Sequence, residues 1–155
     1  MNDKLEFWVP GNPKPAGSKR GFFRPGMKHV AIVDACKESK PWKAQVSATV
    51  AQQLPPDFKL FEGPLAVRFV FQRERPKGHT KPNGDLNANG RRNPYPTTKP
   101  DVLKLSRAVE DACTGILYAD DAQIVEESIC KIWGKPGVRI EIGPVNLYEQ
   151  TPLTL

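Results

Sequence analysis

The strongest hydrophobic periodicity of the chain lies between residues 101 and 117. Its apolar side chains recur at intervals of three and four residues: Val102, Leu105, Val109, Ala112 and Ile116. At about 100° per residue this spacing predicts a helix with one apolar face, and it places Lys104, Arg107 and Asp111 on the opposite face. Leu103 breaks the pattern, because it is a large aliphatic residue on the polar face. Such a side chain requires cover from a loop or a partner chain.

A second helix is predicted over residues 41–54, with the sequence PWKAQVSATVAQQL. Proline suits the first turn of a helix, and the pair Pro55-Pro56 ends it. The large apolar residues of this segment recur every four positions: Trp42, Val46, Val50 and Leu54. We interpret them as a packing face and not as a ligand site.

Five segments have the composition of β-strands. Residues 64–72, PLAVRFVFQ, are the clearest, because they are rich in β-branched and aromatic side chains. The other predicted strands are residues 5–9, 29–34, 123–133 and 138–142. The last two flank the turn sequence GKPG and therefore predict a hairpin.

The resulting order ββαβαββ predicts an α+β fold, with a mixed β-sheet packed against two main helices. The 155 residues, 39% of them hydrophobic, suffice for one core, so we expect a single domain over residues 1–155. No segment approaches the roughly 18 apolar residues of a membrane span, and the start MNDKLEFWVPG lacks the features of a signal peptide. We therefore expect a cytoplasmic protein that does not contact membranes.

Two connections between these elements are long and basic. Residues 11–26, GNPKPAGSKRGFFRPG, are predicted to form a loop, and the glycine spacing and the order Ser18-Lys19 differ from those of a P-loop. Residues 73–100 are rich in proline, glycine and asparagine, which predicts a long loop without regular structure. Loops of this length inside a domain are usually functional or disordered.

The positive charge of the chain is concentrated in the second of these loops. The net charge is +6. Seven basic and two acidic residues lie between Arg73 and Lys99, which gives 7 − 2 = +5 for that segment. Such a concentration favours a polyanionic partner. The predicted DNA-binding residues are Lys19, Arg20, Arg75, Lys77, Arg91, Arg92, Lys99, Lys104 and Arg107.

The cysteines and histidines give no indication of a disulfide framework or a zinc site. Cys36, Cys113 and Cys130 are too widely spaced for either, and His29 and His79 are fifty residues apart. Mostly buried thiols are the better interpretation.

Three aspartates are candidate metal ligands. Asp101 lies at the start of the predicted helix, where capping of the helix is the more common role of an aspartate. Asp120 and Asp121 follow the helix, and a solvated turn is the usual role of such a pair. In combination with the basic loop, however, we expect the three carboxylates to form one acidic site. Such a site favours phosphodiester hydrolysis with Mg²⁺, or Mn²⁺ as a substitute, because these ions prefer carboxylate oxygens. Lys104 or Arg107 would then stabilise charge on the phosphate.

The run TTKPDVLKLSRAVEDACTGILYADDAQIVEE, residues 97–127, resembles the RusA family of Holliday junction resolvases, particularly its phage-borne members. The resemblance rests on KPD opening a helix, a basic residue six positions later, a D-A pair and DD-x-QIV. It implies a homodimeric α+β endonuclease that binds four-way DNA junctions and cuts them with Mg²⁺ held by aspartates. Asp101 matches the first acidic position of the motif, Asp121 matches the essential aspartate, accompanied by Asp120, and Arg107 falls where the family carries an essential basic residue.

Leu103 is the main departure from the family pattern. It stands two positions after Asp101, where the family usually has a second metal-binding aspartate. Either the site is built with fewer carboxylates, with Asp111 or Glu126 as candidates for recruitment, or catalysis is weakened. The alternative function is therefore a protein that binds branched DNA without cutting it. An RNA-binding domain ranks last, since no aromatic-rich RNA-binding signature is present.

Overall fold

The computed structural model describes residues 4–17, 19–34 and 36–145. Its central element is a four-stranded sheet with the strand order β1-β6-β4-β5. The strands are β1 (Leu5–Pro10), β4 (Leu65–Arg73), β5 (Ile124–Trp133) and β6 (Gly137–Pro144). β6 is antiparallel to β1 and β4, whereas β4 and β5 are parallel. The sheet is therefore mixed, which confirms the predicted α+β class.

β5 and β6 do not form the predicted hairpin. β4 lies between them in the sheet, and the short turn that joins β5 to β6 crosses the end of β4, where the amide of Gly134 donates to the carbonyl of Arg73 at 2.9 Å. Both strands were located correctly, but their pairing was wrong, because the hydrophobic pattern of a strand does not specify its neighbour. The clearest predicted strand, β4, takes one of the two inner positions of the sheet.

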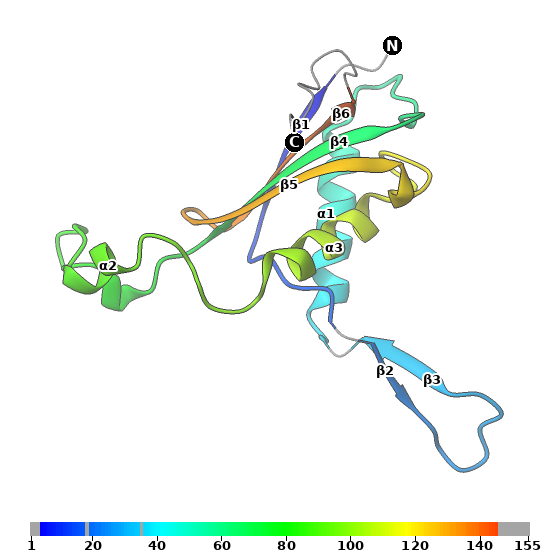
Figure 1. The fold of residues 1–155 in the computed structure, drawn as a ribbon, viewed down its shortest axis with the longest axis horizontal. Coiled ribbons are helices and arrows are strands. Elements are labelled where there is room, and N and C mark those ends of the chain that lie inside the picture. Colours follow the sequence, from blue (N-terminus) through cyan, green and yellow to red (C-terminus); the bar gives the residue numbers. More distant parts are fainter. Residues whose placement is uncertain (1–3, 18, 35, 146–155) are drawn as a thin grey trace, which may run out of the picture.

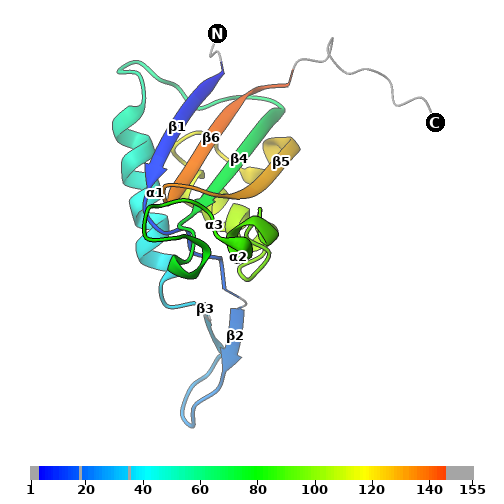
Figure 2. The ribbon, with the colours of Figure 1, turned by 90° about the vertical axis from the view of Figure 1, so that its left-hand side faces the viewer.

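Two helices pack on one face of this sheet, α1 (Ser39–Gln53) and α3 (Val102–Cys113) (Figures 1 and 2). Every second residue of β4 is buried beneath them, while Arg68 between two of these residues is exposed. The predicted packing face of α1 is confirmed, because Trp42, Val46 and Val50 are at most 3% exposed. One core thus lies between the sheet and the two helices.

α3 ends earlier than predicted, at Cys113. Thr114 is extended, and Gly115 has a φ of +81°, a conformation that side chains disfavour. Leu117 and Tyr118 are nevertheless buried. The apolar pattern continues past the end of the helix because these residues still pack into the core.

β2 (Lys19–Phe22) and β3 (Ala31–Asp34) lie outside the main sheet and pair with each other in antiparallel orientation. Together with the connecting residues they form a hairpin, residues 19–34, that extends away from the central sheet (Figures 1 and 2). The prediction of a loop over residues 11–26 is therefore wrong at β2. KRGF shows no strand-like alternation, so only its partner strand was predicted.

Residues 74–100, called the arm below, extend from the end of β4 on another side of the molecule (Figure 1). The prediction that this segment has no regular structure is wrong, because it contains η1 (Lys77–His79) and α2 (Ala88–Arg92). Gly90 in α2 explains how the two helices come together. A Cβ at this position would lie 2.2 Å from the carbonyl oxygen of His79, so only glycine permits this approach.

Cys113 is buried, which raises the pKa of its thiol to about 12, and Cys36 and Cys130 are half-buried. No disulfide joins the cysteines of the described residues. Within the same residues, no helix combines the length and the apolar character needed to cross a membrane.

Candidate active site

Asp101 is the N-cap of α3. Its Oδ1 accepts a hydrogen bond from the backbone amide of Lys104 at 2.9 Å, and its Oδ2 lies 3.9 Å from the ammonium group of the same residue. The capping role that we considered for Asp101 is therefore present in the structure. One carboxylate oxygen remains without a hydrogen bond from a described residue and faces a cation.

Further cations surround this end of α3. Lys131 of β5 donates to the carbonyls of Thr98 and Pro100, both at 2.8 Å, and Arg73 donates to the carbonyl of Lys99 at 2.8 Å. Burial, followed by the charge of Arg73, lowers the pKa of the Lys131 ammonium group, while Asp101 opposes this effect. The N-terminal end of α3 is thus positively charged and anchors the end of the arm.

The aspartate pair lies beyond the other end of α3. Asp120 caps the short helix η2 (Asp121–Gln123), where its Oδ1 accepts from the amide of Ala122 at 2.8 Å and the side chain of Gln123 completes a capping box. Asp121 is exposed, and no hydrogen bond or ion pair with another described residue engages its carboxylate. The Asp121 carboxylate is therefore wholly available to a ligand, whereas the Asp120 carboxylate is partly engaged in capping.

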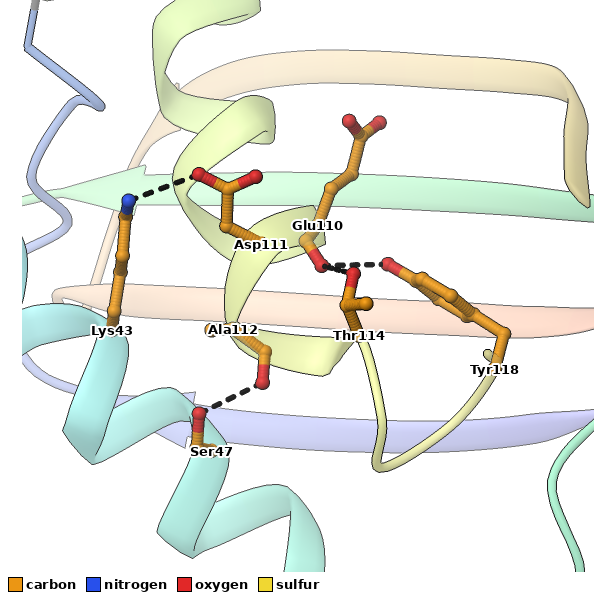
Figure 3. Close-up of polar contacts among 7 residues, drawn as sticks. All are labelled: Lys43, Ser47, Glu110, Asp111, Ala112, Thr114 and Tyr118. Carbon is orange, nitrogen blue, oxygen red and sulfur yellow. Dashed lines mark hydrogen bonds and ion pairs between the residues drawn. The ribbon is translucent and has the colours of Figure 1, made fainter. Parts of the chain in front are cut away.

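Glu110 and Glu127 complete a group of acidic residues near Asp121, and we call these three residues the acidic cluster. Burial, followed by a hydrogen bond to Glu127 and the charges of Glu127, Asp121 and Asp111, raises the pKa of Glu110 to about 7. Figure 3 shows the Glu110 carboxyl group pointing away from Thr114 and Tyr118, which both bond its backbone carbonyl. The side chain is therefore directed towards other acidic groups and not towards a cation.

The structure does not bring Asp101 together with Asp120 and Asp121 within one chain. α3 has 12 residues, which corresponds to about 18 Å at about 1.5 Å per residue. Glu110, which senses the charge of Asp121, lies nine residues beyond Asp101, or about 13 Å along the axis. The sequence suggested that these carboxylates converge, because it does not show where the chain runs after the helix. In the structure, α3 separates Asp101 from the aspartate pair.

The donors of the acidic cluster suit a hard divalent cation in their chemistry. Two of its carboxyl groups are close enough to share a proton, and a divalent cation would relieve the repulsion that favours this protonation. Yet the described residues contain no group of three or more His, Cys, Asp or Glu side chains arranged to hold a metal ion. The fit is thus one of ligand type, and the single chain does not present a complete ligand set in the part described.

The predicted DNA-binding residues fall into two groups. Arg75 is half-buried and structural: it donates to the carbonyls of Gly90 and Asn93 at 3.0 and 3.1 Å and lies 5.4 Å from the ring centre of Trp133. The side chain of Lys19 lies outside the part that the structure describes. The remaining predicted cations are exposed: Arg20, Lys77, Arg91, Arg92, Lys99, Lys104 and Arg107.

Comparison with known proteins now identifies the family. The family model described as "Endodeoxyribonuclease RusA" matches residues 10–143. This chain belongs to the RusA endodeoxyribonuclease family. It is also similar to the protein named "Uncharacterized protein YqaN" of Bacillus subtilis (strain 168), with 30% identity over 145 residues, which covers 93% of this chain and 99% of that protein.

The departure of this RusA-family chain at Leu103 is visible in the structure. Leu103 is 68% exposed, so nothing within the described residues covers it. Of the carboxylates considered as replacements, Asp111 forms an ion pair with Lys43 at 2.9 Å (Figure 3), and Glu126 is exposed on β5. Neither lies at the Asp101 end, since Asp111 precedes the last residue of α3 by only two positions.

Sequence reasoning missed Glu110 and Glu127. Glu127 pairs in register with the buried Val67, so it lies on the face of β5 that carries α3. The signal that could have found them is the two-residue alternation of side chains along β5, which places Glu127 on one face, combined with the position of Glu110 on α3. To use this signal one must know that β4 and β5 pair in parallel, which the sequence does not reveal.

Proposed function

We propose that this RusA-family chain is a Mg²⁺-dependent, structure-selective endodeoxyribonuclease that cuts four-way DNA junctions in recombination, repair or phage DNA processing. The observation that supports it most is Asp121, an exposed carboxylate without a partner among the described residues, beside two further acidic side chains. The family membership supports the reaction class, which is hydrolysis of DNA within the strand.

In this proposal the metal ligands include Asp101, Asp120 and Asp121. When bound, Mg²⁺, for which Mn²⁺ substitutes, supplies activation of water and neutralisation of charge on the phosphate. Arg107 is exposed on α3 between the two acidic groups, and its guanidinium binds oxygens of the scissile phosphate and stabilises their charge. The cations beside Asp101 hold the neighbouring DNA backbone.

The proposed assembly is a homodimer. A four-way junction has two strands of equivalent position, and a two-fold protein presents two equivalent sites to them. In addition, α3 separates Asp101 from Asp121 by more than a metal can bridge, because carboxylate oxygens bind Mg²⁺ at about 2.1 Å. A single site that uses both residues therefore needs Asp101 from one subunit and Asp121 from the other.

The test is cleavage of a synthetic four-way junction in Mg²⁺ by purified variants. Asp121→Asn and Asp101→Asn preserve the shape of the side chain and remove its charge, and each is expected to lower the cleavage rate by about 100-fold or more. Asp57→Asn is the matched control, because Asp57 is an exposed aspartate outside both acidic groups and should retain the wild-type rate. Wild-type rates for both site variants would refute the assignment.

A second candidate function is recognition of branched DNA without cleavage. It is favoured by the exposed Leu103 in place of an aspartate and by the absence of a complete metal-ligand group in the described residues. Such a protein would shift junctions in a gel, with an affinity that falls steeply as salt rises. Junction cleavage by the wild type, lost in Asp121→Asn prepared in the same way, would exclude it.

A further inference from the structure

The β2–β3 hairpin carries bulky apolar side chains that the described chain leaves partly or largely exposed. Phe22, Phe23, Val30 and Ile32 are 37%, 65%, 58% and 68% exposed. The two strands pair only with each other, and the hairpin extends into solvent in both views (Figures 1 and 2). A two-stranded hairpin without a buried face is marginally stable in water, so this element gains stability when a partner covers it.

The charge of the hairpin indicates what kind of partner this is. Residues 19–34 contain four basic side chains and one acidic side chain, which gives 4 − 1 = +3. Arg20, Arg24 and Lys28 form no ion pair with any carboxylate whose side chain the structure describes, a set that does not include Asp34. A partner that covers this surface must therefore be negatively charged, and a second copy of the same hairpin would bring like charges together.

The aromatic and basic side chains alternate in space as well as in sequence. Arg20 and Phe22 lie on the same face of β2, since alternate residues of a strand share a face. The guanidinium of Arg24 lies over the ring of Phe22, 5.3 Å from its centre, which keeps a positive charge beside an apolar surface. Phe23, the next residue, is more exposed than Phe22 and has no such cover.

This combination is suited to nucleic acid with accessible base faces. Positive side chains bind the backbone, and an exposed aromatic ring stacks on a base of any identity. In intact duplex DNA the faces of the bases are covered by their neighbours, and only their edges are accessible in the grooves. An aromatic ring therefore distinguishes DNA in which stacking is interrupted, as it is at a branch point.

The base of the hairpin is fixed to the candidate active site. The amide of Ala16 donates to the carbonyl of Lys104 at 2.9 Å, which joins the segment before β2 to the first turn of α3. Lys14 forms an ion pair with Glu38 at 2.8 Å, which joins the same segment to the residue that precedes α1. DNA bound beside Asp101 is thus on the side of the molecule from which the hairpin extends.

We propose that the β2–β3 hairpin is a junction-sensing element, in which Phe23 stacks on a base exposed at the branch point while Arg20, Arg24 and Lys28 bind the backbone phosphates around it. The proposal rests on the proposed function, in that branched DNA is the substrate. It adds a contact that distinguishes the branch from its duplex arms.

The experiment measures binding without cleavage, by fluorescence anisotropy in EDTA, for a four-way junction and for a linear duplex of the same arm sequence. Phe23→Ala is expected to weaken junction affinity about 10-fold and duplex affinity less than 2-fold, because stacking on one base is lost. Phe23→Trp keeps the stacking surface and should retain the wild-type affinity. Arg24→Ala is the charge control: it should weaken binding to both DNAs and reduce the salt dependence by about one phosphate contact.

A direct readout comes from 2-aminopurine placed at the branch point. Binding of the wild type should change its fluorescence through stacking, and Phe23→Ala should abolish that change while Arg24→Ala retains it. Unchanged junction affinity in Phe23→Ala would overturn the proposal, as would equal losses for junction and duplex. A shift of Phe23→Ala towards smaller species in sedimentation would overturn it too, because it would assign the surface to a second copy of the chain.

Failure of the hairpin proposal and failure of the proposed function remain distinguishable. If the wild type binds junctions in this Phe23-dependent manner but never cuts them, the hairpin proposal is confirmed and the nuclease proposal fails. If the wild type cuts junctions and Phe23→Ala binds them as tightly, the nuclease proposal holds and the hairpin proposal is refuted. Phe23 is 65% exposed, so its replacement should leave the melting temperature unchanged, and a melt of each variant checks this.

Discussion

The two ends of α3 present acidic side chains in opposite electrostatic environments. At the N-terminal end, Asp101 accepts a bond from a backbone amide and faces Lys104, with Lys131 nearby. At the C-terminal end, Glu110 faces Glu127 and Asp121, and its pKa is raised to about 7. A helix also favours negative charge at its N-terminus and disfavours it at its C-terminus. Carboxylates at the first end are therefore compensated by the protein, whereas those at the second end require a cation or a proton from solution.

In the proposed nuclease the two ends of α3 therefore have different tasks. The uncompensated C-terminal end is where a divalent cation gains most, because it relieves repulsion that already exists. The cationic N-terminal end is suited to the DNA backbone, and Asp101 alone provides an acidic ligand there. One reaction that uses both ends must therefore join two subunits.

The largest expected effect comes from mixing subunits that are defective at opposite ends. Asp101→Asn and Asp121→Asn are each inactive in the proposal, but a mixed dimer has one site with both defects and one site with none. Equal mixing gives mixed dimers in half of the population, so nicking of a four-way junction should recover to about a quarter of the wild-type rate. The measurement is strand nicking after denaturing and refolding the two variants together.

The control for this experiment is each variant refolded alone, which should remain at least 10-fold below the mixture. Absence of recovery in the mixture, with dimers confirmed by light scattering, would contradict shared sites. The two ends of α3 would then act independently and have separate functions.

The second prediction concerns the stability of the acidic end and has a defined sign. Glu110 has a folded pKa of about 7 against a reference value of 4.5, so between these pH values the folded state holds a proton that the unfolded state releases. Stability from this group is therefore lost as pH rises from about 4.5 to about 7. Glu110→Gln removes the effect, so the variant should match the wild type at pH 4.5 and exceed it at pH 8.

The expected gain at pH 8 is about 1–2 kcal/mol in the free energy of unfolding, because the full pKa difference corresponds to about 3 kcal/mol and Glu110 is only half-buried. Urea unfolding at the two pH values measures it. Glu62→Gln, at an exposed position, serves as the control. An equal difference between variant and wild type at both pH values would show that Glu110 is ionised in the folded protein and that the repulsion is absent.

These particular residues also show how far the sequence could predict the fold and the site. The helix at residues 102–113 and its exposed Arg107 followed from periodicity alone, since one turn of a helix relates residues that are close in sequence. The position of β4 between β5 and β6 did not, because pairing depends on contacts between distant segments. For the same reason, Asp101 and Asp121 were expected to converge, and the approach of Glu110 to Glu127 was missed.

The smallest expected effect is at Leu103, on the cationic end. Leu103→Asp places a carboxylate in the first turn of α3, where the helix dipole favours it by about 0.3–1 kcal/mol, and the exposed position loses no packing. If the missing ligand limits catalysis, the variant should reach half-maximal cleavage at several-fold lower Mg²⁺ concentration and cut at most a few-fold faster. Leu103→Asn is the matched control, because asparagine has nearly the same shape as aspartate and is also polar, but it carries no charge. Titration of Mg²⁺ and of Mn²⁺ with both variants measures the effect. Identical titrations for the two would mean that the N-terminal end of α3 serves to hold DNA and that the metal depends on the acidic cluster alone.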